Sequence, residues 1–344
     1  MKNNLVSSIL FVAILCSLVY IPKEVFAEET NMSPNFTVNA NLPDNQLEDA
    51  TGYFHLPMQG GQEQQLTVSV SNTTDTVISV SPTLATATTN SNGVISYKET
   101  GKTKDDSLRI DFKSISSLDS ENIELQPFET KELTIDVKIP ETEVEGQILG
   151  GISFEEDLSD EKKESSTMVV NRFSYNIAVM IEVGNRMPEN ELQLNEAYAA
   201  QRSGFNFIEV NLQNTAEKMV SSLAVEASIY QTGKEEPMYI SNRTGLKMAP
   251  NSNFNYGIDL QQTPIKAGDY KIELLINADD KTYEFVKDFT ISSEDAENLN
   301  ESAVLIETPT NYDVVYIISI IVFLVVLSGI VFIVYKKPHS RKLN

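Results

Sequence analysis

Residues 173–183 of the chain read FSYNIAVMIEV. Apolar side chains occupy every second position of this stretch, and the polar residues Ser174, Asn176 and Glu182 stand between them. A period of two places one set of side chains on one face of a β-strand and the other set on the opposite face. The stretch therefore predicts a long strand that packs one face against a hydrophobic core.

The same alternation recurs on both sides of this stretch. It is found in the segments 66–71, 133–139, 208–212, 223–229 and 270–276. Glycine-containing turn signals separate the segments, at positions 60–61, 92–93, 145–146 and 267–269. Many short strands at this spacing are typical of β-sandwiches or barrels. We therefore expect an all-β fold outside the two ends of the chain.

A break in the pattern at 184–188, which reads GNRMP, divides the chain in two. We expect one β-sandwich domain over 28–183 and a second over 189–292, since a fresh set of alternating segments begins near position 192. The segment 293–313 is rich in Asp and Glu and has little to bury. We expect it to be an extended acidic stalk.

The N-terminus predicts a secretory signal peptide over 1–27. Lys2 is followed by an apolar run, and the run ends at Val25-Phe26-Ala27, which suits signal peptidase. Cleavage between Ala27 and Glu28 removes the single cysteine, so the mature chain can form no disulfide and has no thiol nucleophile. The alternative is an N-terminal anchor that stays uncleaved.

The C-terminus predicts one membrane-spanning helix over 314–335. No charged residue lies between Val314 and Tyr335, and a helix of this length at 1.5 Å per residue crosses a hydrocarbon core of ~30 Å. Lys336 and Lys337 follow at once, so the positive-inside rule places the basic tail 336–344 in the cytoplasm. We expect a single-pass membrane protein with its domains outside; the alternative is a buried core helix.

Composition argues against several functions. A net charge of −23 makes nucleic acid a poor partner, although the same acidity also serves solubility alone. Of the two histidines, His339 lies in the tail, so a Ser-His-Asp triad or a zinc site in the exported part would have to use His55 alone. The carboxylates form no distinctive pair motif for glycoside hydrolysis. We expect no enzyme, no cofactor and no metal.

Four motifs follow one another along the chain. The segment 36–46 reads FTVNANLPDNQ and leads to Gly52-Tyr53-Phe54, and it is followed by GQILGGI at 146–152, FSYNIAV at 173–179 and APNS at 249–252. In this order the motifs resemble those of the WxL-interacting proteins of Gram-positive bacteria. The first is similar to the opening of that family's first domain, the next two are similar to its late strands, and the last fits its second domain. The absence of tryptophan is a departure near Phe285, where the family pattern leads us to expect one.

The resemblance implies two Ig-like domains with different partners. The first would bind peptidoglycan, and the second would bind a WxL protein or host extracellular matrix. The expected function is a non-catalytic, membrane-anchored scaffold in the cell-wall zone. Two alternatives remain: an adhesin that acts directly on host matrix, and a hydrolase of wall glycans.

Four residues near the start of the first domain are candidate glycan-binding residues: Asn45, Gln46, Tyr53 and Phe54. An aromatic face beside amides suits a sugar ring. The alternative is a structural role, with Phe54 in the core and the two amides capping a turn.

Two further features have alternative explanations. The pair at 150–151 is Gly-Gly inside a strand, which indicates a bulge or a close approach of a ligand or of a packed side chain. The edge strands of the second domain could pair with a partner's strand, or be protected by charges such as Lys271 and Glu273.

Overall fold

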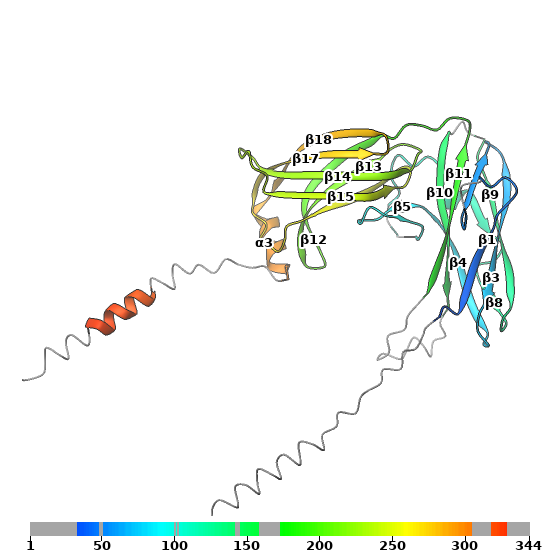
Figure 1. Ribbon diagram of the computed structural model, residues 1–344, viewed down its shortest axis with the longest axis horizontal. Coiled ribbons are helices and arrows are strands. Elements are labelled where there is room, and N and C mark those ends of the chain that lie inside the picture. Colours follow the sequence, from blue (N-terminus) through cyan, green and yellow to red (C-terminus); the bar gives the residue numbers. More distant parts are fainter. Residues whose placement is uncertain are drawn as a thin grey trace, which may run out of the picture. The chain divides into compact units, whose positions relative to one another are not determined.

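A computed structural model of the protein shows mostly β structure (Figure 1). The structure describes residues 33–47, 51–99, 101, 103–141, 145–157, 173–304 and 318–328. The predicted signal peptide at 1–27, with its cleavage site between Ala27 and Glu28, lies outside the described residues. Each of the six alternating segments lies, to within one residue, inside a strand, so the prediction from their period is confirmed.

Two facing sheets form the first sandwich. The first sheet has the order β1 (Phe36–Asn41), β3 (Glu63–Asn72), β9 (Thr130–Lys138) and β7 (Ser116–Leu118). The second has the order β2 (Phe54–Met58), β11 (Ser174–Val183), β10 (Gly146–Glu156), β4 (Ile78–Thr86) and β8 (Ile123–Leu125). Only the pair β2–β11 is parallel among the strand pairs described here. One core cluster fills the space between the two sheets, and it includes Phe36, Phe54, Leu66 and Phe154.

The glycine pair of β10 is explained by packing. A Cβ on Gly150 would lie 2.0 Å from the ring of Phe112, which belongs to the short 3₁₀-helix η1 (Phe112–Ser114). A Cβ on Gly151 would lie 2.6 Å from Tyr97. The register of β10 with both neighbours runs through the pair without a shift, so no bulge is present there. Side chains of the same domain therefore make the close approach.

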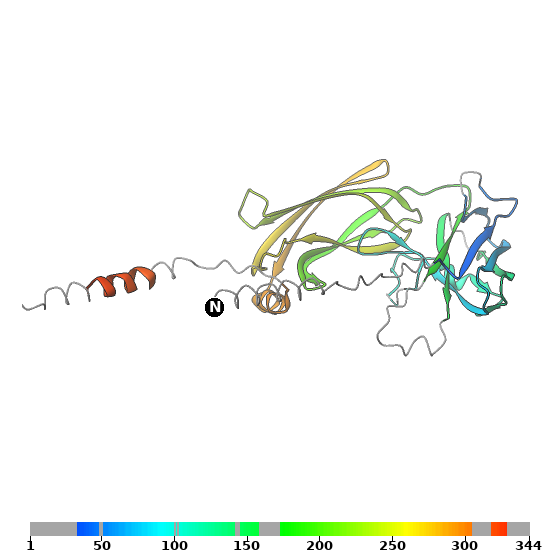
Figure 2. The same cartoon turned by 60° about the horizontal axis from the view of Figure 1, so that its bottom comes forward.

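The second sandwich is antiparallel throughout its described pairs. Its three-stranded sheet has the order β12 (Leu192–Arg202), β13 (Phe205–Asn214) and β16 (Ser252–Asp259). Its four-stranded sheet has the order β15 (Tyr239–Met248), β14 (Val220–Gln231), β17 (Gly268–Ala278) and β18 (Lys281–Ile291). Tyr256 and Phe254 are among its largest fully buried side chains. Figure 2 draws the strands of this sandwich in green, yellow and orange. The predicted division at 184–188 falls between the end of β11 and the start of β12.

The four-stranded sheet corrects one expectation about edges. Lys271 and Glu273 lie on β17, which is bonded to β14 on one side and to β18 on the other. They therefore protect no edge, and the prediction is wrong for these two residues. The edges of this sheet are β15 and β18.

The acidic segment after the second sandwich begins as a helix and not as an extended stalk. Helix α3 spans Ser293–Ser302, and the Ser292 side chain caps it by accepting a hydrogen bond from the Asp295 backbone N–H. Ala296 is buried in the core of the second sandwich, and Leu299 packs against it. The Asn300 side chain also accepts a hydrogen bond from the Ile265 backbone N–H and donates one to the Ile265 carbonyl, each at 2.8 Å. These apolar and polar contacts hold the helix on the second sandwich, so the stalk prediction is wrong for 293–302.

Residues 318–328 are helical, with large apolar side chains exposed along them. Among the described residues, no helix combines the length and the apolar character needed to cross a membrane. Val314, Tyr335, Lys336 and Lys337, which mark the predicted anchor over 314–335 and its basic flank, lie outside the described residues. The membrane anchor therefore stays a prediction.

Candidate functional site

The structure brings the four predicted glycan-binding residues together at the start of β2. Gln46 closes the loop between itself and β2: its Nε2 donates to the Tyr53 carbonyl at 3.0 Å, and its Oε1 accepts from the His55 backbone N–H at 3.2 Å. The Leu47 N–H donates to the His55 carbonyl at 2.9 Å beside it. Gln46 thus has the structural role that the sequence offered as the alternative to glycan binding, because its side-chain amide holds the turn before β2.

Asn45 is held by a reciprocal pair of amide hydrogen bonds. Its Nδ2 donates to Gln64 Oε1 at 3.0 Å, and Gln64 Nε2 donates to Asn45 Oδ1 at 2.8 Å. Gln64 belongs to β3 and also lines a groove of about 870 Å³ on the first sandwich. Asn45 is therefore held by a residue that lines this groove.

The two aromatic candidates differ in exposure. Tyr53 is half-buried and stacks on His55, with ring centroids 6.4 Å apart and planes 15° apart. His55 Nε2 lies 3.0 Å from Glu182 Oε1. Phe54 is 0% exposed in the core of the first sandwich, so its ring cannot stack on a surface ligand and the prediction is wrong for this residue. Tyr53 stays a candidate.

A hairpin formed by β5 (Thr88–Thr89) and β6 (Ile95–Ser96) follows β4 of the first sandwich and contacts the second sandwich. The Thr89 hydroxyl lies 2.7 Å from that of Ser252 and accepts from the Ala249 backbone N–H at 3.0 Å. At the predicted turn, the Gly93 N–H donates to Asn90, and the Gly93 carbonyl accepts from the Lys247 N–H at 2.8 Å. A small apolar cluster that includes Leu149, Met180 and Ala249 lies at the same junction.

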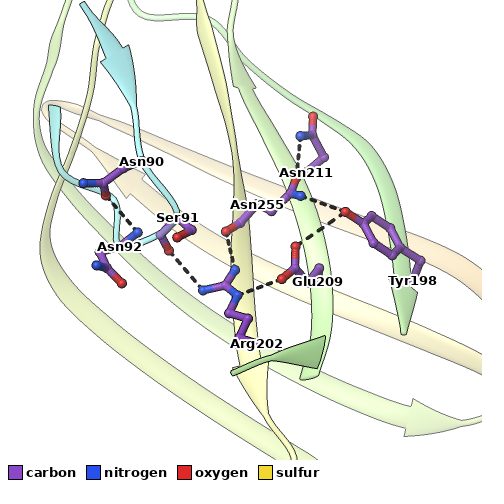
Figure 3. Close-up of polar contacts among 8 residues, drawn as sticks. All are labelled: Asn90, Ser91, Asn92, Tyr198, Arg202, Glu209, Asn211 and Asn255. Atoms are coloured by element: carbon purple, nitrogen blue, oxygen red, sulfur yellow. Dashed lines mark hydrogen bonds and ion pairs between the residues drawn. The ribbon is translucent and has the colours of Figure 1, made fainter. Parts of the chain in front are cut away.

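Arg202 forms the centre of a polar network at the tip of this hairpin (Figure 3). Its Nε donates to Glu209 Oε1 at 2.7 Å, its Nη2 to the Asn255 carbonyl at 2.7 Å and its Nη1 to the Ser91 carbonyl at 3.2 Å. The guanidinium also lies over the Phe207 ring, 5.2 Å from its centroid.

Gly257 of β16 is paired with Glu209 of β13, and a Cβ on Gly257 would lie 2.6 Å from the Arg202 guanidinium carbon. The glycine therefore leaves room for the guanidinium in its present position. The network thus links all three strands of this sheet to the first sandwich.

Asp105 makes a second link between the sandwiches. It accepts hydrogen bonds from Gln213 Nε2 at 2.8 Å, from Asn253 Nδ2 and from the Ser107 hydroxyl and N–H. Burial alone would raise the pKa of Asp105, but the hydrogen bonds from Ser107, Asn253 and Gln213 outweigh it and lower the pKa below its usual value. The carboxylate is therefore held in its charged form.

Between the two links lies a groove of about 700 Å³. Its wall includes Ser91 and Asp105 of the first sandwich, and its floor is the outward face of the three-stranded sheet. Five neutral amide side chains line that floor: Asn195, Asn211, Gln213, Asn253 and Asn255. Alternation in the sequence marks these amides only as outward-facing and does not predict that they line a groove. The feature of the sequence that could have pointed to them is the number of Asn residues in these strands, because Asn is depleted in strands.

Across the described ranges, no three His, Cys, Asp or Glu residues gather in a way that could hold a metal ion. What both surfaces offer is amides, hydroxyls and a few aromatic rings, which bind polar ligands by hydrogen bonds and stacking.

Two family models match the chain in tandem. Residues 36–156 match the model described as WxL Interacting Protein, peptidoglycan binding domain, and residues 164–301 match the one described as WxL Interacting Protein, host binding domain. Both models describe binding domains. No curated protein matches the chain.

Solved structures with some similarity include bacterial chaperones. The class 5 fimbriae chaperone CfaA is 9% identical, with 74% of this chain and 98% of that one covered at a TM-score of 0.29. The YadV chaperone is 9% identical, with 74% and 100% covered at a TM-score of 0.30. The E. coli chaperone DraB is 13% identical, with 75% and 98% covered at a TM-score of 0.27. Likenesses this weak carry no argument about function.

Proposed function

Because the chain belongs to the WxL Interacting Protein family and contains its peptidoglycan-binding and host-binding domains, we propose that it is a non-catalytic scaffold at the cell surface. The first domain, 28–183, holds peptidoglycan. The second, 189–292, holds a WxL protein or a host matrix ligand. The signal at 1–27 exports the chain, and the helix at 314–335 anchors it in the membrane with the tail 336–344 in the cytoplasm.

The observation that carries this proposal is the tandem match of the two family models over both sandwiches. The match to the host-binding model begins at 164 and so includes β11, which the structure places in a sheet of the first sandwich between β2 and β10. Strand β11 is therefore part of the host-binding match in the sequence and part of the first sandwich in the structure. For this reason the proposal is tested on the full chain with point variants and not on separated domains.

The groove beside Asn45 supports the first half of the proposal. Asn45 is fixed by its amide pair with Gln64, which lines the groove, and Tyr53 supplies a half-exposed ring on the same loop. Fixed side chains lose little entropy on binding, which favours affinity. We assign peptidoglycan to this region, with Asn45 and Tyr53 as contacts and Gln46 as the residue that holds their loop.

The edge of β15 supports the second half. In the four-stranded sheet, the edge strand β18 is bonded to the segment that precedes β12, because the Tyr283 hydroxyl donates to the Asn190 carbonyl at 2.5 Å. On β15, the Lys247 backbone N–H is occupied because it donates to the Gly93 carbonyl of the β5–β6 hairpin. The preceding part of β15, from 239 to 243, is an edge on which a partner's strand could add by main-chain hydrogen bonds.

Co-sedimentation tests both halves. The full chain in detergent is mixed with purified peptidoglycan and, separately, with wall extract of the same organism. We expect retention on peptidoglycan and capture of a protein that mass spectrometry identifies as carrying a WxL domain. Tyr53→Ala should weaken peptidoglycan binding about tenfold. Tyr230→Ala, a change of another surface tyrosine far along the chain, is the matched control.

Two results would contradict the proposal. The scaffold reading fails if the full chain sediments with neither peptidoglycan nor a WxL protein yet binds matrix proteins, which would make it an adhesin. A changed composition of the peptidoglycan after incubation would make it a wall-glycan hydrolase.

A further inference from the structure

The outward face of the three-stranded sheet has an unusual composition for a strand surface. On β13 the outward positions include Asn211 and Gln213, and on β16 they include Asn253 and Asn255. Asn is depleted in strands because its side chain competes for backbone hydrogen bonds. Four neutral amides on two neighbouring strands therefore need a reason other than strand stability.

These amides are ordered by one another. Asn195 Nδ2 donates to Asn211 Oδ1 at 2.9 Å and to Gln213 Oε1 at 3.1 Å. Asn211 Nδ2 donates to Asn253 Oδ1 at 3.1 Å and to Asn255 Oδ1 at 2.7 Å. The floor of the groove is thus an array of donors and acceptors with fixed orientation. A ligand that binds it loses little side-chain entropy.

The array keeps hydrogen-bonding capacity for a ligand. An amide nitrogen carries two N–H groups, and an amide oxygen has two lone pairs. Asn255 Nδ2 donates to the Tyr198 hydroxyl at 2.7 Å, and Asn253 Nδ2 donates to Asp105. Each of these bonds uses one of the two N–H groups. Donors and acceptors therefore stand side by side, which matches a ligand rich in hydroxyl groups.

The charges around the groove exclude anionic ligands. Glu209 is neutralised by Arg202, and Lys104 forms an ion pair with Asp111. Asp105, Asp106 and Glu196 remain on the lining as carboxylates. A ligand with carboxylates or phosphates would be repelled by them. A neutral ligand meets no such penalty.

We propose that this groove binds a neutral glycan chain, with Asn253 and Asn255 as the contacting residues and Asn211 as the residue that orients them. Its volume of about 700 Å³ lies in the range of ligand sites and can enclose a few sugar rings. The site is built from both sandwiches, since Ser91 and Asp105 come from the first and the amides from the second. It lies outside the region assigned to peptidoglycan and does not depend on that assignment.

Titration calorimetry on the full chain in detergent tests the proposal with three probes. Chitohexaose and cellohexaose are neutral and differ in their acetamido groups, whereas polygalacturonate is anionic. We expect binding of at least one neutral probe and none of polygalacturonate. Binding of chitohexaose alone assigns the groove to amino-sugar chains, and binding of both neutral probes assigns it to hydroxyl recognition. Binding of neither, or tighter binding of polygalacturonate, overturns the proposal.

Variants then locate the site. Asn255→Ala and Asn253→Ala should each weaken neutral-glycan binding about tenfold. Asn242→Ala, which removes an exposed amide on β15, should leave it unchanged. A loss seen with Tyr53→Ala and not with Asn255→Ala would move the glycan to the first sandwich and overturn the proposal. Peptidoglycan co-sedimentation that fails while Asn255-dependent binding persists would refute only the proposed function.

A direct spectroscopic measurement guards against variants that misfold. Selective ¹⁵N-asparagine labelling of the unmodified chain reports side-chain amide resonances. The glycan should shift the resonances that disappear in Asn253→Ala and Asn255→Ala. If these amides serve only to tie the sandwiches together, no glycan will shift them, and the proposal fails.

Discussion

The second sandwich has two outward faces of opposite character. On the three-stranded sheet, the ion pair Arg202–Glu209 is largely buried, with side chains 23% and 10% exposed, and neutral amides surround it. On the four-stranded sheet, the ion pair Lys271–Glu273 is 38% and 41% exposed. Lys271 there lies over the Tyr230 ring, 4.8 Å from its centroid.

On the three-stranded sheet the charged side chains are held by hydrogen bonds and partly buried, whereas on the four-stranded sheet they are largely in contact with water. Exposed ion pairs contribute little because water screens them and long side chains must be ordered. A buried pair must be complete, because removal of one partner leaves a charge without compensation. The chain places the largely buried ion pair Arg202–Glu209 where the three-stranded sheet meets the first sandwich. The exposed pair Lys271–Glu273 lies on β17, whereas the contact of the four-stranded sheet with the first sandwich is made by β15.

The largest expected effect follows from breaking the buried pair. Arg202→Met removes the partner of Glu209 and the bonds to the Ser91 and Asn255 carbonyls. We expect a loss of about 3 kcal/mol in the free energy of unfolding of the second sandwich, measured by urea denaturation. Glu209→Gln in the same chain should recover part of that loss. If Arg202→Met alone is as stable as the unmodified chain, the partly buried ion pair does not stabilise the second sandwich and the contrast between the two faces fails.

The next effect concerns the amide array. Asn211→Leu keeps the size of the side chain but removes its bonds with Asn195, Asn253 and Asn255. We expect a loss of about 1 kcal/mol in the same denaturation experiment. Asn242→Leu, on exposed β15, is the matched control and should have a smaller effect. Equal losses in both variants would show that the array is no more ordered than an isolated surface amide.

A smaller effect should appear as a dependence on pH. The pKa of Asp105 is lowered in the folded protein, so its contribution is present above its unfolded pKa of about 3.9 and is lost as the pH falls through the folded value. Between pH 5 and pH 3 the unmodified chain should lose more thermal stability than Asp105→Asn. Parallel curves for the two proteins would show that Asp105 does not hold the link between the sandwiches.

The smallest effect is expected on the charged face. Lys271→Met removes an exposed ion pair and leaves Glu273 in contact with water. The thermal unfolding midpoint should therefore stay unchanged within error. A loss of stability as large as that of Arg202→Met would show that the ion pairs on the two faces contribute equally to the stability of the fold.

The sequence predicts the strands well, because alternation directly reports which side chains face a core. It predicts Phe54 less well, since an aromatic residue in a strand can face either the core or a ligand. Helix α3 was missed because its composition is acidic. Ser292 followed three residues later by Asp295 is a helix-start pattern that could have revealed it.

The groove between the sandwiches could not be predicted from the sequence. Its parts come from positions near 91, 105, 211 and 255, and only docking of the β5–β6 hairpin brings them together. Alternation sorts Asn211 and Asn255 to the outward side of their strands and says nothing of what they meet there. Contacts between residues so far apart in sequence depend on tertiary packing and not on local pattern.

Hydrogen–deuterium exchange of the full chain, with and without saturating chitohexaose, tests most directly the central claim that the amide face binds and the charged face does not. We predict slower exchange in β13 and β16 and around Asp105, with no change in β17 and β18. Slower exchange confined to β17 and β18, or no change anywhere, would contradict it.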